Sequence, residues 1–365
     1  MLFRQLADKI IRNQKFIGDG GVNFLPLYPI FPRLKSFLPG FIRGDQVLIT
    51  GGTGAGKSRL GFFIASYLLS LSQTIPNIKI KIFYNSLEEP VEKFKAMFVI
   101  NYLREKHNIR LSYYEIMGYW DKQFPTEYHP YIIEAADYFT NTIEPYFEVV
   151  QIPHPTGFYK LVREFLVKNG TYYFNGVPAN QGEMWDEYRA SDPNQWVITF
   201  SDHIGNYLNE SGKSWYETLE HFSAQYTRQR LGLKCGVVSF FVQQQVPSKE
   251  ALEVNIKGKT IIDKLKPSID GLNKIKTTSQ DATIILGLFY PFKWRDHIPA
   301  AMYLGYDLKL WKNNLRTLIL LKSREGILDD LEMAVLFDGS RNYFAHLDKD
   351  DMDSNEKLLK QVTNV

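Results

Sequence analysis

The chain has 365 residues, of which 44% are hydrophobic and 23% charged, and 43 Lys and Arg against 40 Asp and Glu give a formal net charge of +3. This composition is typical of a folded globular protein and excludes a collagen-like or disordered chain. Because the charge is nearly balanced, any nucleic-acid binding must come from local basic segments. Cys235 is the only cysteine, so we expect no intrachain disulfide and a reducing, cytoplasmic location. No apolar stretch is long enough to span a membrane, and we expect no membrane partner.

The first expected element is an amphipathic helix over residues 2–17, which places Phe3, Leu6 and Ile10 on one side at helical spacing. A Gly-Asp-Gly-Gly run then ends the helix. We therefore expect residues 1–21 to form a linker helix on a glycine-rich leash. Such an element suits docking onto a neighbouring subunit, and packing on its own domain is an equal alternative.

A phosphate-binding loop follows. Residues 51–58 read GGTGAGKS, which matches the pattern G-x-x-x-x-G-K-[ST] without deviation. The glycines let the backbone turn its N–H groups onto phosphate oxygens, Lys57 supplies a charge for the β- and γ-phosphates, and Ser58 offers a hydroxyl to Mg²⁺. A buried strand over 45–50 and an apolar helix over 59–71 provide the context that the motif requires. We therefore predict that ATP and Mg²⁺ bind at Gly51, Gly52, Thr53, Gly54, Ala55, Gly56, Lys57 and Ser58.

Further strands and helices alternate through a core that we expect to span residues 22–346. The predicted strands cover 78–85, 147–152, 196–201, 236–242, 282–289, 315–321 and 331–338. Alternation with helices implies an α/β fold with a doubly wound, mainly parallel sheet. The last two strands are separated by a short turn and indicate an antiparallel hairpin at one edge. Residues 171–194 look like an insertion, and residues 347–365 like an acidic, solvated C-terminal tail.

Two acidic positions follow predicted strands. Glu88 lies in the run Ser-Leu-Glu-Glu-Pro after a strand, where a carboxylate can orient or deprotonate the water that attacks the γ-phosphate. Glu89 opens the next helix, where the helix dipole favours an acid, and both glutamates could serve only that purpose. Asp202 ends the strand WVITFS, which is the position of a second Mg²⁺-binding group in phosphate-loop NTPases.

Polar and basic residues follow the later strands. Gln244, in a run of three glutamines, could hydrogen-bond the γ-phosphate. The loop 246–276 carries an excess of lysine that could hold a phosphodiester backbone, although a solvated surface loop is the alternative. The candidate DNA-binding residues there are Lys249, Lys257, Lys259 and Lys264. In the terminal hairpin, Lys322 and Arg324 share one face of an extended strand and could reach a phosphate in the next subunit, or form an ordinary basic surface.

In this order, across residues 30–344, the motifs resemble the ATPase domain of hexameric replicative DNA helicases of the DnaB type, which has a RecA-like core. Each motif after the phosphate loop is weak alone, but the ordered set is specific. The stretches that carry the resemblance are IFPRLKSFLPGFIRGDQVLITGGTGAGKS, FYNSLEEP, ITFSDHIGNY, FFVQQQ, SQDATIILGLFY and LLKSREG.

The resemblance implies a RecA-like P-loop NTPase and an ATP-driven ring helicase or translocase on single-stranded DNA in DNA replication. It implies a homo-oligomer, a hexameric ring, in contact with other replication proteins. The basic loop would line the central channel, and the linker helix would pack on the adjacent subunit. The implied roles are phosphate and Mg²⁺ binding for Lys57 and Ser58, catalytic base for Glu88, Mg²⁺ and water binding for Asp202, γ-phosphate sensing for Gln244 (or Gln243 in a shifted register), and action in trans for Lys322 and Arg324.

The chain also departs from the family. It has no room for the usual N-terminal domain, which points to a bacteriophage-like version that acts in the host cytoplasm. The segment after Asp202 begins with His203 where an aromatic residue is more usual. Two alternatives stay open: a RecA-like ATPase that assembles on DNA or protein without unwinding, and a small-molecule phosphotransferase. A monomeric phosphotransferase would not depend on Lys322 or Arg324.

Overall fold

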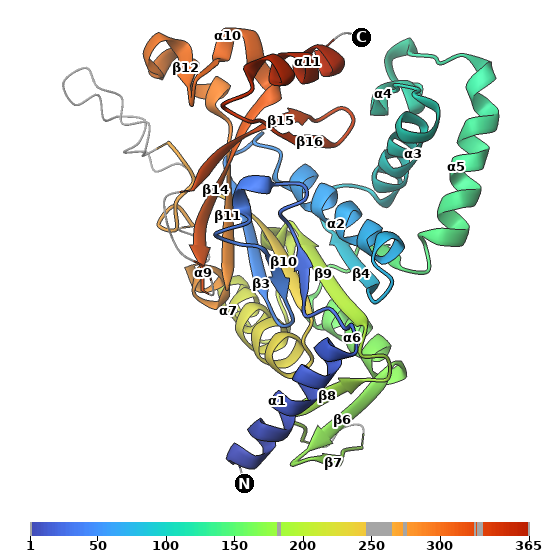
Figure 1. The fold of residues 1–365 in the computed structure, drawn as a ribbon, viewed down its shortest axis with the longest axis vertical. Helices are drawn as coiled ribbons and strands as arrows, with labels where there is room; N and C mark the ends of the chain where they lie inside the picture. The colour runs from blue at the N-terminus through green and yellow to red at the C-terminus, as the bar shows by residue number, and fades with distance from the viewer. Residues whose placement is uncertain are drawn as a thin grey trace.

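The central sheet and the helices on both of its faces are visible in Figure 1. The computed structural model describes residues 2–180, 184–245, 265–272, 276–324, 326 and 331–363. Within these residues, nine strands form the sheet in the order β16-β15-β14-β11-β3-β10-β9-β4-β5. Their bounds are β3 (Gln46–Gly51), β4 (Lys79–Ser86), β5 (Phe147–Val150), β9 (Gln195–Asp202), β10 (Val238–Gln244), β11 (Ile284–Phe289), β14 (Leu315–Ser323), β15 (Glu332–Asp338) and β16 (Tyr343–His346).

Strand direction divides this sheet into two parts. From β11 through β3, β10, β9 and β4 to β5, all neighbours pair in parallel. β14 pairs antiparallel with β11, and β15 and β16 continue antiparallel to the edge. The predicted mainly parallel sheet with a C-terminal antiparallel hairpin is therefore confirmed. The edge itself is β16, a short strand that the sequence pattern did not predict.

Helices fill the connections between strands. The α-helices are α1 (Leu2–Gly18), α2 (Lys57–Thr74), α3 (Val91–His107), α4 (Tyr113–Ile116), α5 (His129–Thr142), α6 (Pro155–Lys168), α7 (Trp215–His221), α9 (Lys276–Asp281), α10 (Leu308–Trp311) and α11 (Met352–Thr363), and a π-helix, η5 (Phe222–Lys234), continues α7. The 3₁₀ turns are η1 (Pro32–Leu34), η2 (Tyr119–Asp121), η3 (Thr126–Tyr128), η4 (Ile204–Asn206), η7 (Pro291–His297), η8 (Pro299–Ala301) and η9 (Lys312–Asn314). Within the described part of the chain, no helix is long and apolar enough to cross a membrane.

The core lies on both faces of the sheet because side chains alternate along each buried strand. In β3, Val47 and Ile49 face one hydrophobic cluster while Leu48 faces the other. The first cluster is closed by apolar residues of α2 and α3. The second is closed by α6, α7 and η5. Helices on both faces make the sheet doubly wound, which leaves the carboxyl ends of its parallel strands open for a ligand.

Three smaller sheets accompany the central one. In the predicted insertion, β6 (Gly170–Phe174), β7 (Val177–Pro178) and β8 (Glu187–Ala190) form an antiparallel sheet. The others are the pairs β1 (Phe24–Pro26) with β2 (Gly40–Ile42), and β12 (Met302–Tyr303) with β13 (Tyr306–Asp307). The insertion sheet lies beside α1 (Figure 1), where Arg12 pairs with Glu187 at 3.1 Å.

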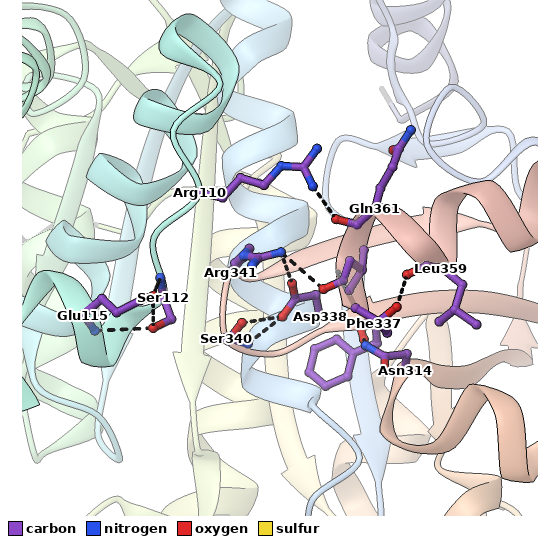
Figure 2. Close-up of polar contacts among 12 residues, drawn as sticks. Arg110, Ser112, Glu115, Asn314, Phe337, Asp338, Ser340, Arg341, Leu359 and Gln361 are labelled. Carbon is purple, nitrogen blue, oxygen red and sulfur yellow. Dashed lines mark hydrogen bonds and ion pairs between the residues drawn. The ribbon is translucent and has the colours of Figure 1, made fainter. Parts of the chain in front are cut away.

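The C-terminal segment differs from the solvated acidic tail expected over residues 347–365. α11 is amphipathic, and Leu359 and Val362 are buried in a cluster with Trp311. Polar contacts also fix the helix (Figure 2): Arg110 donates to the carbonyl of Gln361 at 2.7 Å, next to a buried ion pair between Asp338 and Arg341. The acidic residues that suggested a tail precede the helix or lie on its exposed face. The expectation of a solvated tail rested on this acidic composition and did not take into account the apolar residues at helical spacing.

Candidate nucleotide-binding site

The predicted phosphate loop lies between β3 and α2, as the motif requires. Gly54 and Gly56 have positive φ values of 78° and 99°, a backbone conformation that residues with a Cβ atom rarely adopt. Lys57 is 8% exposed, and its Nζ donates to the carbonyl of Gly52 at 3.1 Å, so the side chain curls over the loop. Burial lowers the Lys57 pKa, while nearby Glu88 and Asp202 raise it. The loop thus presents a cation and the N-terminus of an 18-residue helix to one space.

Asp202 and Ser58 meet at this loop. The Ser58 hydroxyl donates to Asp202 Oδ1 at 2.9 Å, and the Tyr84 hydroxyl donates to Oδ2 at 2.9 Å. Asp202 is 1% exposed, and burial raises its pKa to about 6 against the effect of these two hydrogen bonds. A hydroxyl and a carboxylate side by side are the oxygen donors that Mg²⁺ prefers, so these residues fit a Mg²⁺–nucleotide complex. Tyr84, which the sequence pattern did not single out, orients the carboxylate.

The two neighbouring glutamates after β4 have different surroundings. The Glu89 carboxylate pairs with Lys93 and lies 4.0 Å from Arg59, and its carbonyl accepts a hydrogen bond from Ser86. Glu88 is exposed, and its charge acts on Lys57 and on Asp202. Glu89 is therefore held by cations on the helices, whereas Glu88 stands at the open side of the site, where a water-activating carboxylate would be needed.

The register of β10 separates the adjacent glutamines. Gln243 is 2% exposed and accepts a hydrogen bond from Thr278 at 2.7 Å, away from the phosphate loop. Gln244 points to the other side, and its Nε2 donates to Thr53 Oγ1 at 2.6 Å. Gln244 is therefore the residue in contact with the loop, and the alternative register with Gln243 does not fit this geometry.

His203 is a further residue at the site that sequence reasoning did not assign. Its ring nitrogens face the backbone N–H groups of Gly205 and Gln244. Burial, together with the charge of Lys57, lowers the His203 pKa to about 4. A protonated ring could accept from neither N–H group, whereas a neutral ring accepts at one of its two nitrogens, so the neighbouring donors and the lowered pKa both favour the neutral form of His203.

Two more cations at the loop were also missed. Lys293, exposed in η7, donates to the carbonyl of Thr53 at 3.4 Å. Arg316, 3% exposed in β14, donates to the carbonyl of Ala55 at 2.7 Å. Burial lowers the Arg316 pKa to about 9, so this residue keeps its charge at neutral pH. The available signal was an arginine inside an otherwise apolar strand, LRTLILL.

Lys322 and Arg324 lie elsewhere. Both donate to carbonyls at the end of α9: Lys322 to Ser279 and Arg324 to Gln280, each at 2.6 Å. In the sheet, Ser323 is level with Ile284, which pairs with Val47 near the start of β3. Four further residues of extended strand, about 13 Å, separate that level from the phosphate loop. The two cations are therefore at the opposite end of the sheet from the loop of their own chain.

The candidate DNA-binding residues Lys249, Lys257, Lys259 and Lys264 lie outside the described residues. Of the same basic stretch, Lys266 is described: its ammonium pairs with Glu332 at 2.9 Å. Its charge is thus already engaged within the chain.

Comparisons with known proteins bear on the fold. No protein-family model matches the sequence, and no curated protein sequence matches it. The structure is similar to the ATPase domain of G40P, with a TM-score of 0.65 and 15% identity over 94% of this chain and 99% of that chain. It is also similar to a DnaB-like replicative helicase studied for its interactions with primase, with a TM-score of 0.64 and 15% identity over 93% of this chain and 68% of that chain. The fold is that of the RecA-like ATPase domain of DnaB-type helicases.

The RecA-like fold predicted from the sequence is thus confirmed. At 15% identity the likeness establishes a shared fold, and folds of this kind host many activities. What this chain does has to be argued from its own site.

Proposed function

We propose that this protein is an ATP-driven ring helicase or translocase that moves on single-stranded DNA during replication and hydrolyses ATP between subunits. The observation that carries the proposal is the separation of two sets of functional groups on one chain. Lys57, Ser58 and Asp202 converge at the carboxyl ends of the parallel strands. Lys322 and Arg324 lie at the other end of the sheet. A neighbouring subunit is needed to bring both sets to one nucleotide.

Each group in the first set has a chemical task in this proposal. The backbone N–H groups of the loop and Lys57 hold the β- and γ-phosphates. Mg²⁺ held by Ser58 and, through water, by Asp202 would neutralise phosphate charge when bound. Glu88 accepts the proton of the attacking water, and Gln244 reports the γ-phosphate to the basic loop that follows it.

The second set supplies cations from the adjacent subunit. A planar guanidinium at a γ-phosphate stabilises the charge of the transition state, and its absence leaves hydrolysis slow. If hydrolysis requires such a contact in trans, the hydrolysis of ATP in one subunit depends on the position of the adjacent subunit. This dependence suits a motor arranged as a ring.

Steady-state ATP hydrolysis, measured with and without single-stranded DNA, tests the proposal. We expect DNA to stimulate hydrolysis and the protein to displace a strand from a forked duplex. DNA-stimulated hydrolysis without displacement would favour a RecA-like ATPase that does not unwind. Hydrolysis that is indifferent to DNA and to Arg324 would contradict the proposal and favour a self-contained NTPase.

Mixing variants tests action in trans. Arg324→Ala alone and Glu88→Ala alone should each reduce hydrolysis by more than tenfold. Mixed in equal amounts, they should regain activity, because about a quarter of randomly formed interfaces pair a site with an intact Glu88 with an intact Arg324 from the adjacent subunit. A mixture of Lys57→Ala with Glu88→Ala is the control: both defects lie in the same site, so it should regain nothing. Absence of rescue in the first mixture would contradict the action of Arg324 on the nucleotide of the adjacent subunit.

Helix α1 supports assembly with a second copy. Its apolar residues remain uncovered, with Phe3 85%, Leu6 50% and Ile10 51% exposed. An apolar stripe of this kind marks an interaction surface. We expect the triple change of Phe3, Leu6 and Ile10 to Ser to shift the protein from oligomer to monomer in size-exclusion chromatography with light scattering, while ADP affinity is retained. Serine at Arg4, Asp8 and Ile11 is the matched control and should be milder, and an unchanged oligomer in the triple variant would show that α1 is not a subunit contact.

A further inference from the structure

We propose that Arg316 is a positioning residue that holds the phosphate loop from behind in its nucleotide-binding shape. The inference rests on the proposed function only in taking residues 51–58 as a nucleotide site. Arg316 lies on β14 and never needs to touch the nucleotide. It acts through the carbonyl groups of the loop.

The contacts of Arg316 engage all three nitrogens of its guanidinium. Nε donates to the carbonyl of Ala55 at 2.7 Å, and Nη2 donates to that of Gly54 at 3.3 Å. Nη1 donates to the carbonyls of Asn313 and Leu315, each at 2.8 Å. The planar fork thus joins two peptide groups of the loop to the start of β14 and the residues just before it, which a point charge such as lysine could not do.

Two aromatic rings complete the surroundings of the Arg316 guanidinium. The guanidinium carbon lies 3.7 Å from the ring centre of Tyr290 and 4.7 Å from that of Phe337. Phe337 also supports the loop directly, because a Cβ added at Gly56 would lie 2.9 Å from its ring. Among the described residues, no carboxylate forms an ion pair with Arg316. A buried cation without an acid is costly, so its carbonyl and ring partners must satisfy it.

The geometry of the peptide group explains how the contacts of Arg316 orient the phosphate loop. In a trans peptide the carbonyl and the N–H point in opposite directions. With the carbonyls of Gly54 and Ala55 turned to Arg316, the N–H groups of Ala55 and Gly56 turn to the other side of the loop. The Ala55 N–H closes a turn onto the carbonyl of Gly52 at 3.2 Å, and the Gly56 N–H is left at the start of α2 for an anion. Arg316 therefore preorganises the anion-binding face before the nucleotide arrives.

The test compares two buried arginines. Arg316→Met keeps the aliphatic stem and removes the fork, and Arg341→Met removes the buried partner of Asp338 (Figure 2). We expect Arg316→Met to raise the Kd for Mg²⁺–ADP at least tenfold and to accelerate hydrogen exchange of residues 51–58 in the nucleotide-free protein. Arg341→Met should lower the melting temperature without either effect. Arg316→Lys, which keeps charge and most of the volume, should fold and fall between wild type and Arg316→Met in ADP affinity.

The outcomes separate this inference from the proposed function. If wild-type protein binds ADP and Arg316→Met binds it equally well, the positioning role is overturned while the helicase proposal stands. Arg316→Lys takes the place of Arg316→Met in this comparison if Arg316→Met does not fold. If wild-type protein does not bind ADP, the nucleotide site itself fails. If Arg341→Met weakens ADP to the same extent as Arg316→Met, the effect is one of general stability, and the positioning role is overturned as well.

Discussion

A Glu88→Gln protein is expected to bind Mg²⁺–ATP and to hydrolyse it about 10² to 10⁴ times more slowly than wild type. Gln keeps the size of the side chain and removes its capacity to accept a proton. Glu88 is exposed beside Lys57 and Asp202, so the lost negative charge should, if anything, strengthen the binding of an anionic nucleotide. Single-turnover hydrolysis and equilibrium binding of a fluorescent ATP analogue measure the two effects separately.

Glu89→Gln is the matched control for this prediction. The Glu89 carboxylate is already paired with Lys93 and lies within 4.0 Å of Arg59, so it is held at the start of α3 instead of facing the nucleotide. We expect its loss to reduce hydrolysis by at most about tenfold, through small shifts of α3. A larger loss in Glu89→Gln than in Glu88→Gln would reverse the assignment of the base.

An Asp202→Asn protein is expected to be more stable than wild type at pH 8 and at least a hundredfold less active with Mg²⁺. Burial raises the pKa of the Asp202 carboxyl to about 6, against 3.8 for an unperturbed side chain. Above pH 6 the folded wild type therefore carries a buried negative charge whose desolvation costs stability. Asparagine removes that cost, but it cannot supply the charge that holds Mg²⁺ and its water.

The sign of the pH dependence follows from the same shift. Between about pH 4 and pH 6 the folded state binds a proton at Asp202 that the unfolded chain does not, so this carboxyl makes folding less favourable as pH rises through that window. The stability gained by Asp202→Asn should be near zero at pH 4 and reach about 1 to 3 kcal/mol at pH 8. Unfolding by denaturant, without nucleotide or Mg²⁺, at pH 4 and pH 8 measures this difference in stability.

Asp192→Asn offers a control of opposite sign. Asp192 pairs with Lys79, and this hydrogen-bonded contact lowers its pKa. Its replacement should therefore cost stability at pH 8, where the wild-type carboxylate is charged and paired. If Asp202→Asn also lost stability at pH 8, the buried charge would be a net support of the fold, and desolvation would not be the dominant effect at Asp202.

Much of the fold could be predicted because its signals are local. The eight residues of the phosphate loop carry their chemistry in consecutive positions, and glycine, lysine and serine there have few other uses. The buried strands were visible as short apolar runs bounded by polar residues, and their alternation with helices implied parallel pairing. β16 was not predicted because four residues with mixed polarity give no periodic signal. α11 was not predicted because acidic residues dominate the composition of this segment.

Consecutive residues were enough to predict the nucleotide loop and the order of strands along the chain, and the ordered set of motifs was enough to predict the RecA-like fold. The tertiary structure adds a physical basis for preferring Glu88 over Glu89 and Gln244 over Gln243, which could be ranked from the sequence only by analogy. Each choice depends on which side chain faces the loop and which is held by another partner. Likewise, Tyr84 meets Asp202 across 118 positions and Arg316 meets Ala55 across 261. Such contacts arise from strand pairing and burial, which bring together residues whose local sequence carries no trace of the partner.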